Sequence, residues 1–325
     1  MKKILITGGA GYVGASLVPK LLNKGYKVTV YDLMIYGDTL DHHPNLNIVN
    51  GDIRNISLLN SSLKNQDIVL HLACISNDPS FELNPQLGKS INFDCFEPFL
   101  KKCISNKIQK FIYASSSSVY GVKKVKNVTE DELLEPLTDY SKYKADCEKI
   151  LAQYQSETFS TTTIRPATVC GYSKRQRFDL VVNLLTNLAF NNKKITVLGG
   201  DQLRPNIHID DMCDLYITII ESPKKNIDGE TFNVGYDNET VMNLARNVKS
   251  IIGDNVEIIK LPTNDNRSYH ISSSKIKNKI GFFPKKTVLD AIKDLKNAFN
   301  NNLFQDSLNN EKYFNIKMMQ KINLH

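Results

Sequence analysis

The chain has 325 residues, of which 41% are hydrophobic and 23% are charged, so it can form one large or two modest domains and is not typical of a disordered protein. Its formal net charge of +7 comes from scattered Lys and Arg residues, which favours a solvated surface with a few phosphate contacts over a nucleic-acid-binding face. Apolar stretches fall short of the ~20 residues of a membrane span. The N-terminal stretch is also too short for a signal peptide, so we expect a cytoplasmic protein that binds neither nucleic acid nor membrane.

Short β-branched runs alternate with helical patterns along the first half of the chain. The predicted strands cover residues 3–7, 27–32, 47–50, 68–72, 110–115 and 160–165. The predicted helices cover residues 16–23, 56–63, 92–105 and 141–155. This alternation predicts βαβ units, and therefore an α/β fold with a doubly wound parallel sheet and helices on both faces.

The rhythm changes after Pro166, where helices are predicted at 181–190, 210–221, 241–252 and 288–300. Short strands are predicted at 194–198, 231–234 and 256–261, and the second of these could rejoin the large sheet. The Asn-rich tail from residue 301 is polar, although residues 313–322 regain apolar side chains. We expect a smaller C-terminal α/β lobe built partly from insertions.

A glycine-rich turn stands between the first predicted strand and the first predicted helix. In the segment TGGAGYVG at residues 7–14, Gly8 permits the tight turn, Gly11 lets the backbone approach a pyrophosphate, and Gly14 allows close helix packing. The following helix N-terminus offers free N–H groups to phosphates. Asp32 ends the second strand eighteen positions after Gly14 and can accept hydrogen bonds from a ribose 2′-hydroxyl, while its charge repels a 2′-phosphate. The pattern predicts NAD as cofactor, and Asp52, which ends the third strand, could meet the adenine edge or cap a helix.

A second constellation follows the fifth strand. Tyr140 and Lys144 lie one helical turn apart, so they share a helix face. A tyrosine hydroxyl has a pKa near ~10, and a neighbouring ammonium favours its anion, which makes Tyr140 a candidate general acid or base. The serine-rich loop at residues 115–118 can supply a hydroxyl that hydrogen-bonds the reacting oxygen.

The six cysteines form no CxxC pair and no His/Cys cluster with zinc-ligand spacing, so we predict no metal site. Most of them lie in apolar segments, as buried free thiols of a reducing compartment do.

Taken together, these motifs resemble the extended short-chain dehydrogenases/reductases of the NAD-dependent nucleotide-sugar epimerase/dehydratase group, including UDP-glucose 4-epimerases. The resemblance covers nearly the whole chain and rests on TGGAGYVG (7–14), GDIRN (51–55), HLA (71–73), SSSVYG (116–121), YSKYK (140–144) and RPNIHIDD (204–211). It implies a seven-stranded Rossmann domain at residues 1–169 and 208–236, and a nucleotide-sugar-binding lobe at 170–207 and 237–325. It also implies a homodimer formed through the helices near 92–105 and 141–155.

The resemblance assigns roles residue by residue. It implies Ser116 as the catalytic hydroxyl, Tyr140 as the acid/base and Lys144 as the residue that tunes it. It implies cofactor contacts by the residues of the glycine turn and of the strand ends, namely Gly8, Gly11, Tyr12, Val13, Gly14, Asp32, Asp52, Ile53, Leu72, Ala73, Asn92, Ala114, Tyr140, Lys144 and Pro166. It implies nucleotide-sugar contacts by Ser76, Asn77, Ser116, Ser117, Thr168, Arg175, Arg177, Arg204 and Arg267.

The resemblance also narrows the reaction. Dehydratases of this group carry Asp-Glu directly after the catalytic hydroxyl, whereas this chain has Ser117 and Ser118 there. We therefore expect a nucleotide-sugar 4-epimerase that works through a transient 4-keto sugar. The alternatives are a C4 dehydrogenase or 4-ketoreductase with tightly bound NAD(H), and a non-catalytic NAD-binding regulator. Thr168 and Tyr269 depart from the pattern of the UDP-glucose/UDP-galactose enzymes, so the sugar and the base stay open.

Overall fold

The computed structural model describes residues 2–123, 125, 127–263, 268, 270–322 and 324. Within these ranges the principal feature is a seven-stranded sheet with the order β10-β6-β5-β4-β1-β2-β3, in which every neighbouring pair is parallel. Its strands are β1 (Lys3–Thr7), β2 (Lys27–Asp32), β3 (Leu46–Asn50), β4 (Ile68–His71), β5 (Lys110–Ala114), β6 (Ser160–Pro166) and β10 (Glu230–Val234). The predicted doubly wound fold is confirmed, and the late strand does rejoin the sheet beside β6.

Alternating strand residues divide the interior into two cores. Ile4 and Ile6 of β1 face a core that includes residues of α1 (Gly14–Asn23) and α8 (Ile209–Glu221). Leu5 faces the other core, built with α2 (Ile56–Ser62), α5 (Phe96–Ser105) and α6 (Asp139–Tyr154). This alternation follows from the two-residue period of a strand, and it places a helical layer on each face of the sheet.

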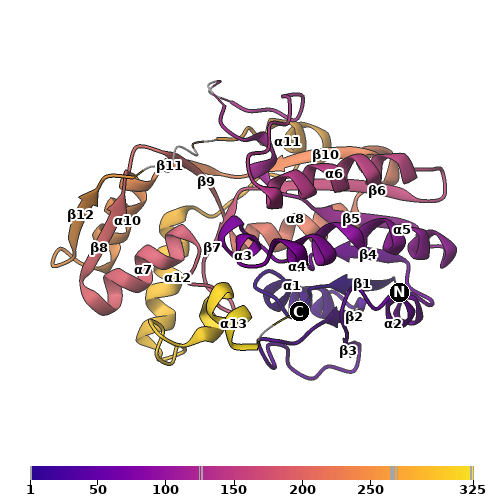
Figure 1. Cartoon of the computed structure of the whole chain (residues 1–325), viewed down its shortest axis with the longest axis horizontal. Helices are drawn as coiled ribbons and strands as arrows, with labels where there is room; N and C mark the ends of the chain where they lie inside the picture. The colour runs from indigo at the N-terminus through magenta and orange to yellow at the C-terminus, as the bar shows by residue number, and fades with distance from the viewer. Residues whose placement is uncertain are drawn as a thin grey trace.

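The remaining elements form a lobe beside the carboxyl end of the sheet (Figure 1). In the lobe α7 (Val181–Asn192) and α10 (Val241–Ile252) pack on the strand pair β8 (Lys194–Leu198) and β12 (Glu257–Leu261), and α12 (Val288–Asn300) packs on both helices. A three-stranded sheet of β7 (Thr168–Cys170), β9 (Leu203–His208) and β11 (Asp237–Thr240) connects it to the large sheet. The finer domain boundaries given above stay a prediction.

Short elements complete the described chain. They are α3 (Asp78–Glu82), α4 (Pro85–Lys89), a π-helical turn (Ser90–Asp94), a 3-10 turn (Ser117–Tyr120), α9 (Lys224–Ile227), α11 (Ser274–Ile280), a 3-10 turn (Glu311–Tyr313) and α13 (Asn315–Ile322). Helix α13 contacts α3, so the C-terminal segment returns to the N-terminal half of the molecule. All six cysteines are free, and among the described helices none is both long and apolar enough to cross a bilayer.

The glycine turn after β1 is held at a close approach to the end of β4. Gly8 has φ +72°, and a Cβ at this position would lie 2.6 Å from the backbone nitrogen of Ala73. A side chain here is therefore disfavoured twice, by the left-handed backbone and by the neighbouring chain. Because β1 and β4 flank the point where the strand order reverses, this contact brings the turn to the place where doubly wound sheets bind ligands.

We expect Gly8→Ala to lower the free energy of unfolding by about 3 kcal/mol, the sum of a left-handed alanine and an overpacked site. Gly25→Ala is the matched control, since Gly25 has φ +85° but open space around its Cβ position, and it should cost about 1 kcal/mol. Urea unfolding of the two variants measures the difference. Equal losses would show that the approach to Ala73 carries no cost.

Candidate active site at the carboxyl edge of the sheet

A cavity of about 380 Å³ runs along the carboxyl ends of the parallel strands. It brings together most of the residues that the sequence assigns to the cofactor, from the glycine turn at one end to the Tyr140 helix at the other. These lining residues are Gly8, Gly11, Tyr12, Val13, Gly14, Asp32, Ile53, Leu72, Ala73, Ala114, Tyr140, Lys144 and Pro166. One continuous cavity therefore connects the dinucleotide fingerprint with the candidate catalytic side chains.

Asp32 is oriented by one backbone group of the glycine turn and by one backbone group of the segment that follows β2. Its Oδ2 accepts a hydrogen bond from the Ala10 N–H at 3.0 Å, and its Oδ1 accepts one from the Met34 N–H at 2.9 Å. Burial raises the pKa of Asp32, while these two hydrogen bonds oppose the shift. A carboxylate oxygen has a second lone pair, so the fixed side chain can still accept a ribose hydroxyl from the cavity.

The N-terminus of α1 faces the same end of the cavity. Its N-cap is Val13, whose apolar side chain cannot accept hydrogen bonds from the first turn, and that first turn carries no acidic residue. Free N–H groups and the positive end of the helix dipole are the features that bind phosphate groups in dinucleotide-binding folds. The residues present at this end therefore fit the adenosine and diphosphate part of NAD.

Ser116, Tyr140 and Lys144 lie together at the other end. A hydrogen bond joins the side chains of Ser116 and Tyr140, and the Ser116 Oγ also lies 2.8 Å from the Ser118 Oγ. The Lys144 Nζ donates to the Ala114 carbonyl at 2.6 Å and lies 5.9 Å from the centre of the Tyr140 ring. Lys144 is thus tied to the end of β5, with its charge beside the Tyr140 ring.

The environment of Tyr140 disfavours the phenolate. Burial raises the pKa of Tyr140 well above its usual range, and the nearby Cys74 and Asp78 add to the shift. The hydrogen bond with Ser116 and the charge of Arg177 act in the opposite direction. A further positive charge at this end of the cavity would favour the anion, and the nicotinamide ring of NAD supplies such a charge.

A buried ion pair lies directly behind this group. Glu148, on α6 one turn after Lys144, accepts from the Nη2 of Arg165 at 2.6 Å and from its Nε at 3.1 Å. The Ser115 hydroxyl donates to the same carboxylate, and the Arg165 Nη1 donates to the Tyr120 hydroxyl at 2.6 Å. Although burial opposes the charge, these partners raise the pKa of Arg165 above its usual range. The network fixes α6 against β6 and the loop after β5.

A smaller cavity of about 230 Å³ adjoins the larger one beside the candidate catalytic side chains. Asn77, Asp78, Ser118, Thr168 and Leu180 line both cavities, and Arg204 lines the smaller one. Asn77 adopts φ +74°, an uncommon conformation for a non-glycine residue that is enriched at functional sites. The second cavity is therefore placed to receive a ligand whose reacting part lies beside Ser116 and Tyr140.

The other residues assigned to the nucleotide sugar are distributed as follows. Ser76, Ser117, Arg175 and Arg177 line the larger cavity, although Ser117 is only 2% exposed. Arg267 lies outside the described residues. Their assignment to the substrate stays a prediction.

Two residues assigned to the cofactor do not line either cavity. The Asp52 carboxylate is held by Arg54, whose Nη2 donates at 2.6 Å, and this pairing lowers the pKa of Asp52 against the effect of burial. The Asn92 side chain bonds the backbone of Ile75 in both directions, at 2.8 and 2.9 Å, and so fixes the loop after β4. Both side chains have a structural role here, and direct cofactor contact by them stays a prediction.

Sequence reasoning missed Tyr36, Asn315 and Met319, which also line the larger cavity. Tyr36 lies four residues after Asp32, so the stretch that follows β2 was a signal that could have identified it. The apolar residues at 313–322 indicated that this segment packs against the rest of the chain, and this signal could have pointed to Asn315 and Met319. Their position over the cavity depends on the return of the chain to α3, which no local pattern encodes.

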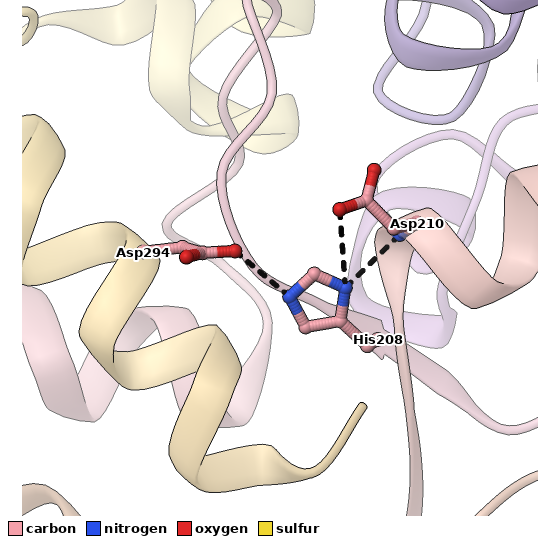
Figure 2. Close-up of side chains that lie close together, drawn as sticks. All are labelled: His208, Asp210 and Asp294. Atoms are coloured by element: carbon pink, nitrogen blue, oxygen red, sulfur yellow. Dashed lines mark hydrogen bonds and ion pairs between the residues drawn. The ribbon is translucent and has the colours of Figure 1, made fainter. Parts of the chain in front are cut away.

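A cluster of His208, Asp210 and Asp294 has the residue types of a metal site (Figure 2). The side-chain atoms of these three residues already form hydrogen bonds and ion pairs with one another and with neighbouring lysines. The His208 Nδ1 accepts from the Asp210 N–H at 3.0 Å, and the His208 Nε2 lies 3.1 Å from the Asp294 Oδ2. Lys286 and Lys20 approach the Asp210 carboxylate at 2.6 and 3.1 Å. We interpret the cluster as a polar network that joins β9, α8 and α12.

Comparison with known proteins identifies the family to which this arrangement belongs. The family model of the NAD dependent epimerase/dehydratase family matches residues 4–235. The chain belongs to this family. It is therefore an NAD-dependent enzyme of the extended short-chain dehydrogenase/reductase type, and the cavity that the fingerprint lines is the place where its residues fit NAD.

Individual relatives cover most of the chain but differ in the reaction named. The UDP-glucose 4-epimerase of Lactobacillus helveticus is 26% identical over 314 residues, covering 89% of this chain and 94% of that protein. The dTDP-D-glucose 4,6-dehydratase of Dictyostelium discoideum is 29% identical over 262 residues, covering 74% of this chain and 59% of that protein. The crystal structure of the Thermotoga maritima UDP-glucose 4-epimerase with UDP-glucose has a TM-score of 0.85 at 27% identity, covering 93% of this chain and 100% of that one.

We expect Glu148→Gln to lower the free energy of unfolding by about 3–5 kcal/mol, because it leaves the Arg165 charge buried without its counter-ion. Glu97→Gln is the control, since Glu97 forms an exposed ion pair with Lys101 at 3.1 Å and its loss should leave stability nearly unchanged. Thermal and urea unfolding of both variants measure the effect. A small loss for Glu148→Gln would mean that the pair does not hold α6 in place.

Proposed function

We propose that this protein is a nucleotide-sugar 4-epimerase that works through a transient 4-keto sugar, with Tyr140 as acid/base. The observation that carries the proposal is that Ser116, Tyr140 and Lys144 all line the larger cavity, which shares Asp78 and Ser118 with the smaller one. A ligand seated in the smaller cavity would present its reacting carbon to both the hydroxyl pair and the cofactor.

The chemistry needs one proton and one hydride. NAD, when bound, accepts a hydride from C4 of the sugar and later returns it. Tyr140 takes the proton of the 4-hydroxyl through its Oη as the C4 carbonyl forms, and gives a proton back to the 4-oxygen after the 4-keto sugar has turned to present its other face, so that the alcohol reforms with the opposite configuration. Ser116 hydrogen-bonds the same oxygen, and the Lys144 charge favours the phenolate. Atoms and electrons balance, since the product is an isomer of the substrate and no cofactor is consumed.

The absence of a carboxylate at positions 117 and 118 supports epimerisation over dehydration. Ser118 lies within hydrogen-bond distance of Ser116, so the segment after the catalytic hydroxyl contributes hydroxyl groups in place of an acid. A 4-epimerase needs no further acid/base group, whereas elimination of water from the keto sugar does.

The substrate class follows from the second cavity and from the relatives. Arg204 lines this cavity, and a guanidinium group suits the oxygens of a diphosphate. The Thermotoga maritima relative was solved with UDP-glucose. We infer a nucleoside-diphosphate sugar as substrate, and a homodimer formed through α5 and α6 as the assembly.

We expect Tyr140→Phe to lower turnover about 10³-fold, because it removes the hydroxyl that exchanges the proton. The assay incubates the enzyme with UDP-, GDP-, CDP- and dTDP-sugars and identifies the products by NMR. Tyr143→Phe is the matched control on the same helix, since the Tyr143 ring packs on Phe93, outside both cavities. Tyr143→Phe should leave both turnover and NAD affinity unchanged.

The products decide between the candidate reactions. Inversion at C4 with no net change in NADH supports the proposal. Accumulation of NADH with a 4-keto product would replace it by the C4 oxidoreductase, and a product lighter by one water would replace it by a dehydratase. Full turnover by Tyr140→Phe would contradict the assigned role of Tyr140.

A further inference from the structure

Two neighbouring arginines in the larger cavity differ in how their charges are compensated. Arg177 donates from Nε and Nη2 to the Asp179 carboxylate at 2.8 and 3.1 Å, and from Nη1 to the Ser76 hydroxyl at 2.9 Å. Arg175 is only 4% exposed, yet its Nε and Nη1 have no hydrogen-bond partner among the described residues. Burial and the charge of Arg177 lower the pKa of Arg175, while Asp179 raises the pKa of Arg177.

A buried guanidinium with unsatisfied donors is costly, since a charge in a poorly solvated site needs hydrogen-bond acceptors as well as nearby opposite charge. The side chain is nevertheless held firmly. Its guanidinium stacks on the Tyr36 ring at 3.5 Å, and its Nη2 donates to the Asn315 Oδ1 at 2.6 Å. Arg175 lines the larger cavity, and its Nε and Nη1 are both buried without an acceptor among the described residues.

The position of Arg175 indicates which ligand these donors meet. Tyr36 follows β2, and Arg175 lies close enough to influence the Asp32 carboxylate. The loop that carries Arg175 is fastened to the start of α1, because the Ser173 hydroxyl donates to the Tyr12 carbonyl at 2.8 Å. Arg175 therefore lies at the adenosine and phosphate end of the cavity, away from the smaller cavity, which it does not line.

We propose that Arg175 binds the diphosphate of NAD, and that the C-terminal helix α13 holds it in place for this contact. The sequence had assigned Arg175 to the sugar nucleotide, so the proposal transfers it to the cofactor. It rests on NAD binding and is independent of the reaction at C4.

The support from α13 depends on one buried residue. Asn315, which is 6% exposed, accepts hydrogen bonds from Arg175 and from the Tyr36 hydroxyl at 2.9 Å. Its Nδ2 donates to the Ser76 hydroxyl at 3.0 Å, and its backbone N–H donates to the Asp179 carboxylate at 3.2 Å. Met319 continues from this junction along the cavity wall. The C-terminal segment thus connects three loops around the cavity, namely the loop after β2, the loop after β4 and the loop that carries Arg175.

The first test measures the affinities of NAD, ADP-ribose and adenosine for nucleotide-depleted full-length protein by calorimetry. We expect Arg175→Gln to weaken the binding of NAD and of ADP-ribose by roughly 10- to 100-fold, because it removes charge-assisted hydrogen bonds to phosphate. Adenosine, which has no phosphate, should bind as before. The melting temperature of the nucleotide-depleted variant should not fall, since a buried charge with two unsatisfied donors has been removed.

Lys174→Gln is the matched control. It removes the same formal charge one position away, but Lys174 is 47% exposed and pairs with the exposed Asp41. It should leave all three affinities unchanged. UDP affinity is measured in parallel. Equal weakening of adenosine and NAD binding by Arg175→Gln, a loss confined to UDP binding, or a lower melting temperature with unchanged affinities would each overturn the assignment to the diphosphate.

Asn315→Asp tests the link to α13. A carboxylate at this position would pair with Arg175 and take the place of the phosphate, so the nucleotide-depleted protein should become more stable while NAD binds more weakly. These two changes have opposite signs, which a purely structural role for Asn315 would not produce. Lower stability with unchanged NAD affinity would overturn the role of α13. If the protein showed no 4-epimerase activity, the NAD affinities and melting temperatures would still test the role of Arg175. The proposed function and the proposed role of Arg175 can therefore fail separately.

Discussion

The buried pair of Arg165 and Glu148 is the interaction on which the catalytic end of the cavity depends. Arg165 stands near the carboxyl end of β6, and Glu148 stands on α6 one turn beyond Lys144. The parallel sheet provides an edge, but it does not by itself fix the rotation of a helix that crosses it. The bidentate geometry of a guanidinium on a carboxylate does fix it, since both groups are planar and nearly dry. The same carboxylate receives Ser115, so the position of the serine loop and the rotation of α6 are determined together.

This arrangement explains why Ser116 and Tyr140 meet although 23 intervening positions separate them in the sequence. Lys144 adds a third tie, because its ammonium bonds the last carbonyl of β5. Three cationic or acidic side chains thereby connect β5, β6 and α6 within two helical turns. Replacement of such a pair by apolar groups often preserves stability, so its presence here is better explained by orientation than by stability.

Sequence periodicity predicted the large elements well because their signal is local. The strands at 3–7 and 27–32 and the helix at 288–300 have the predicted bounds, since continuous burial on a sheet or an amphipathic face leaves a pattern in the chain itself. The helix at 78–82 was missed, because it is short and starts from Asn77 in a left-handed conformation, which no periodicity reports. The strand at 203–208 contains Pro205, which argues against a strand in isolation. The apolar residues of the helix at 315–322 are visible in the sequence, but its place over the cavity depends on tertiary contacts of Asn315 and Met319.

The two ends of the large cavity have opposite electrostatic requirements. At the adenosine end, a buried guanidinium lacks an acceptor for two of its donor groups among the described residues. At the other end, burial and nearby acidic groups disfavour the Tyr140 phenolate. A dinucleotide with an anionic diphosphate and a cationic nicotinamide ring satisfies both requirements in one orientation only, with its phosphates toward Arg175 and its ring toward Tyr140. The charges of the cavity therefore favour the orientation in which the nicotinamide ring lies beside Tyr140, the residue proposed to exchange the proton, before any contact with the sugar is made.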